Sequence, residues 1–158
     1  MLVRLYHPDD AEAVADVYRD AVKTIGPQAY TLEQVSMWAL YPEDINEFRV
    51  RLSRGHTLLA VEQGQILAFG QLEPDDHLAF IYCSGKHGRR GIGSAIYRLL
   101  EAHAIAQGTA RICTEASRIS RPFFAKHGYE LIEREVAVRH GIEFERFRMV
   151  KTLISANR

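Results

Sequence analysis

The strongest constraint on the fold is a set of three strand-like segments that follow one another with almost no chain between them. They cover residues 57–62, 65–73 and 77–84. Gln63-Gly64 separates the first two, and a Pro-Asp-Asp sequence at residues 74–76 separates the second from the third. Turns this short join antiparallel neighbours, because a parallel neighbour needs a crossover of about a dozen residues or more. We therefore predict a sheet whose centre is antiparallel.

Helical patterns precede these strands. A short strand at residues 2–6 leads into a helix over residues 11–25, whose apolar residues recur at helical spacing. The sequence Thr31-Leu-Glu-Gln34 resembles a capping box and predicts the start of a second, short helix. Residues 42–54 are expected to form one more helical stretch, which Gly55 ends. The first third of the chain is thus predicted to be a strand followed by three helices.

The rest of the chain alternates between the two kinds of element. From residue 92 the apolar residues follow a period of about 3.6, and this helix ends at Gln107-Gly108. A strand at residues 110–115, a helix at residues 119–127 and two strands flanking His140-Gly141 complete the chain. The order β-α-α-α-β-β-β-α-β-α-β-β predicts an α/β (α+β) fold with helices flanking a mixed central sheet. No linker divides residues 1–158, so we expect a single domain.

Composition excludes several classes of function. Twenty Lys and Arg residues balance twenty Asp and Glu residues, so no net field draws the molecule to nucleic acid or to an anionic membrane. The apolar runs are too short to span a bilayer and the N-terminus lacks a signal-peptide pattern, so we expect a cytoplasmic protein. Cys83 and Cys113 form neither a CxxC motif nor a disulfide framework, and both are expected to be reduced.

The segment most informative about function is Gly88-Arg-Arg-Gly-Ile-Gly-Ser94, between a predicted strand and a predicted amphipathic helix. Helix N-termini attract anions, glycines allow close approach of the backbone, and arginines add positive charge, so we expect a bound phosphate or diphosphate. No GxxxxGK[ST] motif occurs, and a dinucleotide-binding interpretation would place Ile96 where the third glycine belongs. A nucleotide-dependent kinase or dehydrogenase is therefore disfavoured.

On these residues the chain resembles the GNAT superfamily of N-acetyltransferases, in particular its small bacterial YafP-type members. The hallmark of that superfamily is [Gln/Arg]-x-x-Gly-x-[Gly/Ala], and Gly88-x-x-Gly91-x-Gly93 matches it here with Gly88 in place of Gln or Arg. The resemblance includes Pro122-Phe-Phe-Ala-Lys-His-Gly-Tyr129 and Tyr30-x-x-x-Gln34-x-x-x-Trp38, and it covers nearly the whole chain. It implies the GNAT fold, with transfer of an acetyl group from acetyl-CoA to an amine.

The resemblance also implies where the co-substrate binds. Loop amides would hold the coenzyme A diphosphate, and the strand before the loop would pair with the pantetheine amides. Ser117 and Ser120 replace an Asn and an Ala that are common in the family, and their hydroxyls would contact the cofactor. Phe124 replaces a tyrosine that protonates the leaving thiolate in many members, so that acid is absent. The expected cofactor-binding residues are Ile81, Tyr82, Cys83, Gly88, Arg89, Arg90, Gly91, Ile92, Gly93, Ser94, Ser117, Ser120 and Phe124.

An amine acceptor needs a base or a water chain beside the thioester. A lysine-like amine has a pKa of about 10.4, and its deprotonation at pH 7 costs roughly 4.6 kcal/mol. His77 is the first candidate for a catalytic base, because it lies on the strand that leads to the loop and its ordinary pKa is near neutrality. Glu73 is the second. The alternatives are an exposed histidine at a hairpin end and a plain surface carboxylate.

The sequence says less about the acceptor site, about metal binding and about an oligomeric partner. Tyr30 and Trp38 lie where the family's acceptor-binding helices are, and aromatic faces suit an amine, although a core position is the stronger alternative for Trp38. The remaining histidines form no HxxxH pair and no cluster with cysteine, so we expect no metal site. The final hairpin offers an edge for a homodimer. The identity of the amine stays open.

Two alternatives to an enzyme remain. Phe124 and Gly88 also suit a non-catalytic acyl-CoA-binding sensor or regulatory module, which would bind the thioester without turnover. An unrelated phosphate-binding or nucleic-acid protein would respond to a polyanion and not to coenzyme A. The expectation that the sequence favours is an acetyl-CoA-dependent N-acetyltransferase in which the amine attacks the thioester directly.

Overall fold

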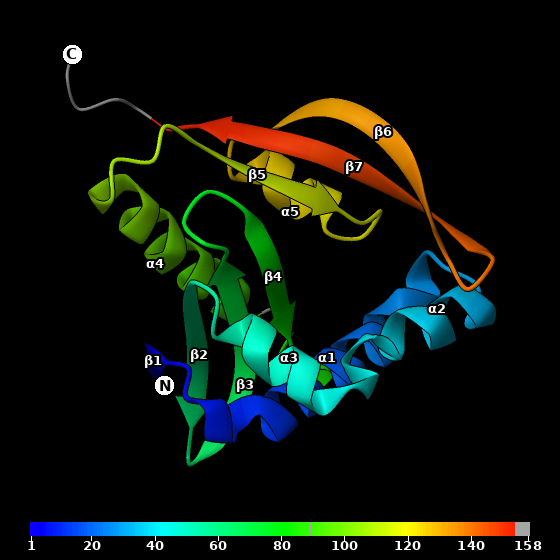
Figure 1. Ribbon diagram of the computed structural model, residues 1–158, viewed down its shortest axis with the longest axis horizontal. Helices are drawn as coiled ribbons and strands as arrows, with labels where there is room; N and C mark the ends of the chain where they lie inside the picture. The colour runs from blue at the N-terminus through cyan, green and yellow to red at the C-terminus, as the bar shows by residue number, and fades with distance from the viewer. Residues whose placement is uncertain (89, 154–158) are drawn as a thin grey trace.

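The computed structural model describes residues 1–88 and 90–153, which form two antiparallel sheets (Figure 1). The first sheet has the order β1-β2-β3-β4, and the second has the order β5-β7-β6. Their strands are β1 (Leu2–Leu5), β2 (His56–Glu62), β3 (Gln65–Leu72), β4 (Leu78–Cys83), β5 (Arg111–Ala116), β6 (Glu130–Arg139) and β7 (Ile142–Thr152). The predicted antiparallel centre is confirmed, because β2, β3 and β4 pair with one another in sequence order.

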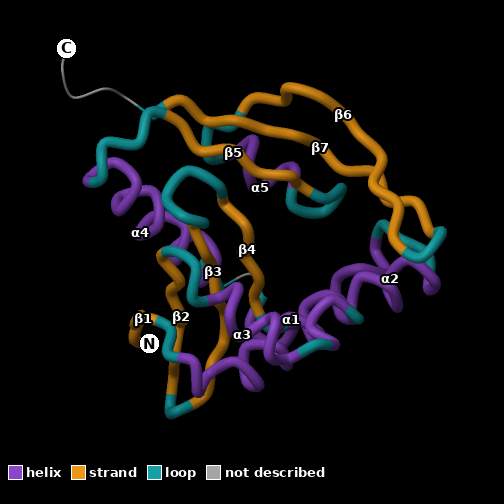
Figure 2. Tube along the Cα trace, in the orientation of Figure 1, coloured by secondary structure: helices purple, strands orange, loops and turns teal. Residues whose placement is uncertain are grey.

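Helices cover both faces of the first sheet (Figure 2). One face packs against α1 (Ala11–Ile25), α2 (Leu32–Ala39) and α3 (Ile45–Leu52), and the other packs against α4 (Ile92–Ala106). The short helix α5 (Arg121–Lys126) follows β5 and joins the same core as α4. No helix in the described ranges is long and apolar enough to cross a membrane.

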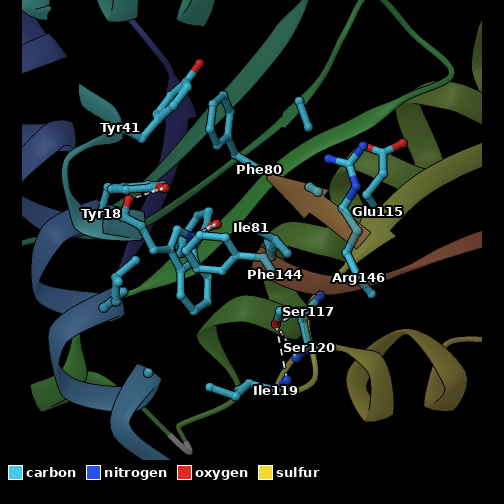
Figure 3. Close-up of a pocket in the computed structure, with 18 of the residues that line it drawn as sticks. Tyr18, Tyr41, Phe80, Ile81, Glu115, Ser117, Ile119, Ser120, Phe144 and Arg146 are labelled. Atoms are coloured by element: carbon cyan, nitrogen blue, oxygen red, sulfur yellow. Dashed lines mark hydrogen bonds between the residues drawn. The ribbon is translucent and has the colours of Figure 1, made fainter. Parts of the chain in front are cut away.

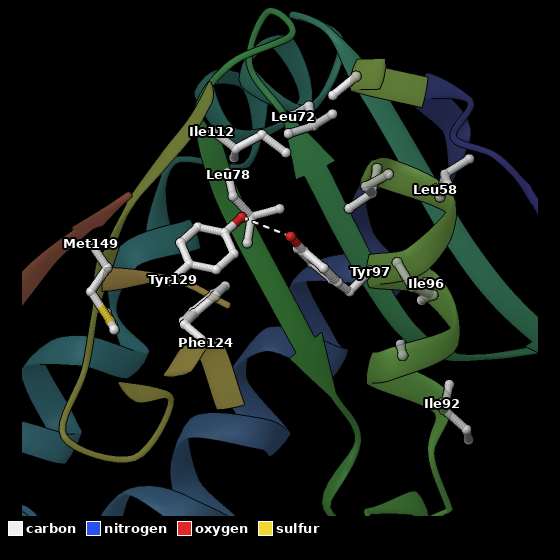
Figure 4. Packing of buried hydrophobic residues seen from close by; sticks show 14 of the residues in the cluster. Leu58, Leu72, Leu78, Ile92, Ile96, Tyr97, Ile112, Phe124, Tyr129 and Met149 are labelled. Carbon is white, nitrogen blue, oxygen red and sulfur yellow. Dashed lines mark hydrogen bonds between the residues drawn. The ribbon is translucent and has the colours of Figure 1, made fainter. Parts of the chain in front are cut away.

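The core between α4 and the two sheets brings distant parts of the chain together (Figure 4). Ile96 and Leu100 of α4 are fully buried against Gly70 of β3. A Cβ at residue 70 would lie 2.9 Å from Leu100 and 3.0 Å from Ile96, so glycine lets α4 lie directly on the backbone of β3. The close packing fixes α4, and with it the loop that precedes α4, relative to the sheet.

Two predicted helices have different limits in the structure. Residues 42–54 do not form one stretch, because Asp44 is extended and its side chain accepts the N–H of Glu47, which starts α3 anew. A 3-10 turn at Tyr41–Glu43 precedes this break. The helix predicted at residues 119–127 begins at Arg121, because the residues before it form a turn around the Ser117 hydroxyl. The capping box is confirmed, since Thr31 and Gln34 exchange hydrogen bonds of 3.0 and 3.1 Å.

Candidate active site

The two sheets meet where β4 and β5 run parallel and then separate. His77 and Cys113 form a parallel bridge, the Cys113 N–H donates to Asp76 O at 2.9 Å, and Thr114 Oγ1 donates to Leu78 O at 2.8 Å. Beyond these contacts no further bridge joins β4 to β5 among the residues that the structure describes. The strands are therefore closed at the His77 end and open toward Cys83 and Ala116.

An irregularity in β4 accompanies this separation. Leu72 of β3 pairs with Leu78 and Gln71 pairs with Phe80, so the register passes over Ala79 as a β-bulge. Further along, Ser84 N donates to Leu67 O at 2.8 Å. Because hydrogen-bonded positions alternate in an antiparallel pair, the N–H and C=O groups of Ile81 and Cys83 point away from β3, toward the split. One edge of the opening is thus lined with main-chain donors and acceptors.

A cavity of about 820 Å³ occupies this opening and extends toward α1, α2 and the β6–β7 hairpin (Figure 3). The residues predicted for the site that line it are Tyr30, Trp38, His77, Ile81, Tyr82, Cys83, Ser117, Ser120 and Phe124. Glu73 and the described loop residues from Gly88 to Ser94 are not part of its lining, and Arg89 falls outside the described residues. The structure therefore brings most of the predicted site together in one cavity.

The glycine-rich loop ends at the N-terminus of α4. Gly91 is the N-terminal cap residue and has φ 76° and ψ 11°, in the left-handed region that glycine adopts without strain. The first helical hydrogen bond is donated by Ala95 to Gly91 O, so the N–H groups of residues 92–94 have no acceptor within the helix. A Cβ at Gly91 or Gly93 would contact nothing within 4 Å, which leaves the backbone there open to a ligand. Arg90 is exposed and lies 3.4 Å from Glu62.

His77 and Glu115 form an ion pair at the closed end of the split, with 2.9 Å between Nε2 and Oε1. The hydrogen bond that the His77 ring donates to the Glu115 carboxylate raises the pKa of His77, against an opposing effect of burial. The pKa of Glu115 is lowered, first by its hydrogen bond with His77, with further contributions from Arg146 and Arg148. Figure 3 shows the side chains of Glu115 and Arg146 turned toward one another on the cavity wall. The pair can accept or release a proton beside the cavity.

Glu73 has a different environment from His77. Its carboxylate lies 3.3 Å from the Arg51 guanidinium and 3.8 Å from that of Arg54. Arg51 also stacks on Phe80, with its guanidinium carbon 5.0 Å from the ring centroid. Glu73 thus holds an arginine whose side chain forms part of the cavity wall, and it does not line the cavity itself.

Aromatic side chains form the wall on the side of α1 and α2. Tyr30 is 8% exposed, and its hydroxyl accepts the N–H of Arg118 at 2.8 Å. Trp38 is partly buried, packs edge-on against Tyr30, and donates from Nε1 to Tyr82 Oη at 3.3 Å. Both residues therefore belong to the packing and to the cavity lining at once.

Phe124 and the two serines also line the cavity. Phe124 is 2% exposed and presents an apolar ring to the cavity. Ser117 and Ser120 organise the turn between β5 and α5, with 3.1 Å between their hydroxyl oxygens. The phenol that the family resemblance associates with position 124 is replaced here by a side chain without a proton donor.

Several residues of the cavity were not among the predicted site residues. They include Tyr18, Tyr41, Phe80, Glu115, Phe144 and Arg146. Glu115 belongs to a predicted strand, but the sequence contains no sign that this position would face His77 across a sheet boundary. Among the described residues, no group of three or more His, Cys, Asp and Glu side chains could hold a metal ion.

A comparison with protein families decides the classification. The model of the acetyltransferase (GNAT) domain matches residues 27–153. This chain belongs to the GNAT acetyltransferase family. The predicted resemblance to that family is thereby confirmed, as is the fold, and the chain is accordingly an acetyltransferase.

Individual relatives agree with the classification. The Escherichia coli (strain K12) protein named "Uncharacterized N-acetyltransferase YafP" is 23% identical over 148 residues, 93% of each chain. A Rhodopseudomonas palustris structure described as a GCN5-related N-acetyltransferase, "Aminotransferase, Class-II", is 30% identical with a TM-score of 0.92, over 96% of this chain and 95% of that one. The PaiA N-acetyltransferase of Thermoplasma acidophilum, solved in complex with coenzyme A, is 16% identical with a TM-score of 0.78, over 97% and 100%. At that identity the likeness shows the shared fold.

Proposed function

We propose that this GNAT acetyltransferase transfers the acetyl group of acetyl-CoA to a primary amine that attacks the thioester directly. The observation that carries the proposal is the split between β4 and β5, which opens from the His77–Glu115 pair toward main-chain groups of Ile81 and Cys83. The split provides an extended donor and acceptor edge for the pantetheine amides. It also places a titratable pair at the end where an acyl group would lie.

The diphosphate of coenzyme A would bind at the N-terminus of α4. The free N–H groups of residues 92–94 and the helix dipole favour a negative charge there, and Gly91 and Gly93 allow an oxygen to approach the backbone. We assign the same role to Gly88 and Ser94 by their place in the loop. Arg90 would exchange its exposed pairing with Glu62, which contributes little to stability, for a phosphate oxygen.

The amine would enter from the aromatic wall. Tyr30, Trp38 and Tyr82 surround this part of the cavity, and aromatic faces attract ammonium groups. His77 would then accept the proton that the amine loses, since an amine with a pKa of about 10.4 is cationic at neutral pH. The nearby Glu115 carboxylate stabilises the resulting imidazolium. Glu73 would act indirectly, by holding Arg51 in the cavity wall.

A sensor that binds acyl-CoA without turnover is the second candidate, because Phe124 presents no proton donor to the cavity. An enzyme releases the coenzyme A thiol in the presence of its amine, whereas a sensor does not. With acetyl-CoA present, a panel of small amines, amino acids, polyamines, aminoglycosides and peptides should include at least one that releases the coenzyme A thiol, detected with a chromogenic disulfide. If acetyl-CoA raises the melting temperature but no amine releases thiol, the sensor is supported and the enzymatic proposal fails.

The assembly and location of the protein are further proposals. β6 is an edge strand of ten residues, and Ile132, Val136 and Val138 on it are more than half exposed. Pairing of this edge with a second copy would cover them, which supports the homodimer expected from the final hairpin. We propose a cytoplasmic protein without a nucleic-acid or membrane partner, in keeping with its balanced charge.

A further inference from the structure

Two serine hydroxyls organise the turn between β5 and α5, and their hydrogen bonds determine which way each hydroxyl donates. Ser117 Oγ accepts the N–H of Ser120 at 3.0 Å and the N–H of Ile119 at 3.2 Å. A hydroxyl oxygen has two lone pairs, and both are then in use. Ser117 must therefore be the donor in its 3.1 Å contact with Ser120 Oγ.

Ser120 Oγ is in turn saturated as an acceptor. It receives the hydroxyl hydrogen of Ser117 at 3.1 Å and the backbone N–H of Ser117 at 2.9 Å. Its own hydrogen has no acceptor among the residues that the structure describes. Ser120 is left with one free O–H group and no free lone pair, so it can only donate to a further partner.

The free hydroxyl lies on the wall of the cavity (Figure 3). Phe124 follows four residues later on the same helix face and also lines the cavity. Two other hydroxyls of the lining already donate within the protein, Thr114 to Leu78 O and Tyr18 to Trp38 O. Ser120 follows the end of β5 at the open side of the split, where the pantetheine arm is proposed to run, and the sulfur is the terminal atom of that arm.

We propose that the Ser120 hydroxyl donates a hydrogen bond to the sulfur atom as the coenzyme A thiolate leaves, which makes Ser120 a catalytic residue. This rests on the proposed function. The amine lone pair forms the C–N bond while the carbonyl π electrons move to oxygen. When the C=O bond re-forms, the C–S bond breaks and its electron pair goes to sulfur, where the Ser120 O–H stabilises the charge. Ser120 keeps its proton. Nitrogen loses two protons, one from the ammonium before attack and one after the C–N bond has formed; each passes through His77 to solvent, and the thiolate is protonated by solvent.

Single-turnover rates with enzyme in excess over acetyl-CoA test the proposal, using the amine of highest turnover. Loss of a hydrogen bond to a charged group in the transition state is expected to lower the rate by about ten- to hundredfold. We therefore expect Ser120→Ala to slow acetyl transfer by about that factor with an unchanged Kd for acetyl-CoA. Ser120→Thr keeps the hydroxyl and should retain the wild-type rate within about threefold.

The double variant Ser120→Ala with Phe124→Tyr tests whether the loss of rate in Ser120→Ala is catalytic or structural. It does not repair the turn, but it supplies a new hydroxyl from the same helix face, so it should recover at least part of the lost rate. An unchanged rate in Ser120→Ala overturns the proposal, and so does a loss that follows only acetyl-CoA affinity or melting temperature. If the wild-type protein binds acetyl-CoA but releases no thiol with any amine, the proposed function fails and the role of Ser120 fails with it.

Discussion

His77 Nε2 lies 2.9 Å from Glu115 Oε1, next to the bridge that closes one end of the split between β4 and β5. The two residues are 38 positions apart in the chain; His77 directly precedes β4 and Glu115 lies in β5. Because the same junction both closes the split and positions the pair, the candidate base is fixed relative to any ligand in the split. The junction between β4 and β5 therefore determines the position of the candidate base.

The His77–Glu115 pair predicts how activity depends on pH. His77 acts as a base only when it is unprotonated, and Glu115 raises its pKa, so kcat/KM should rise with pH through a value above the ordinary 6.5. Glu115→Gln removes the carboxylate charge and should move this rise to lower pH. The amine titrates identically in both assays, so the difference between the profiles reports the enzyme. Coincident profiles would exclude the pair as the titrating group.

Substitution with glutamine, which conserves size and polarity, tests whether His77 or Glu73 is the catalytic base. His77→Gln removes the proposed base and should lower kcat by about a hundredfold. Glu73→Gln breaks an ion pair with Arg51 and should change kcat by less than about threefold, with a loss of stability of about 1 kcal/mol or less. Steady-state kinetics and thermal melts check both. The opposite ranking would assign the base to Glu73.

Gly91 and Gly108 provide a matched pair at the two ends of α4. Their φ values are 76° and 78°, and a Cβ at either would contact nothing within 4 Å. Leucine at either position should therefore cost a similar roughly 1–2 kcal/mol of stability. Only Gly91→Leu should abolish acetyl-CoA binding, because its side chain fills the space proposed for the diphosphate. Equal affinities in the two variants would remove the loop from the binding site.

Gly93→Ala should change stability and binding in opposite directions. Gly93 lies in the first turn of α4 with open space around its Cβ, and alanine in a helix is more favourable than glycine by about 0.5–1 kcal/mol. The melting temperature should therefore rise by about 1–3 °C. Affinity for acetyl-CoA should fall, because the methyl group meets the incoming phosphate oxygens. A variant that is more stable and binds as tightly as the wild type would contradict the proposed contact.

The parts of this fold that the sequence predicts are those set by local interactions. Short turns at Gln63-Gly64 and before His77 require antiparallel neighbours, and the Thr31 and Gln34 side chains cap a helix within one turn. The glycine-rich loop before α4 likewise combines features that are contiguous in the chain. The break at Asp44 was missed, because its N-cap competes with a helical pattern that continues across it.

The parts that the sequence does not predict depend on register between distant strands. Glu115 faces His77 only because β5 meets β4 at one bridge, and the bulge at Ala79 changes which way the following β4 residues point. Phe144 reaches the cavity only through the pairing of β6 with β7 and the contact of that hairpin with α2. No local pattern encodes these relationships, so the acceptor side of the cavity emerges only from the assembled fold.

Calorimetric titration of acetyl-CoA into the intact protein tests the central claim most directly, because the claim is that the split and the α4 N-terminus together bind this thioester. We predict saturable heat with one acetyl-CoA per chain. Absence of saturable heat from folded protein at millimolar acetyl-CoA would contradict the account.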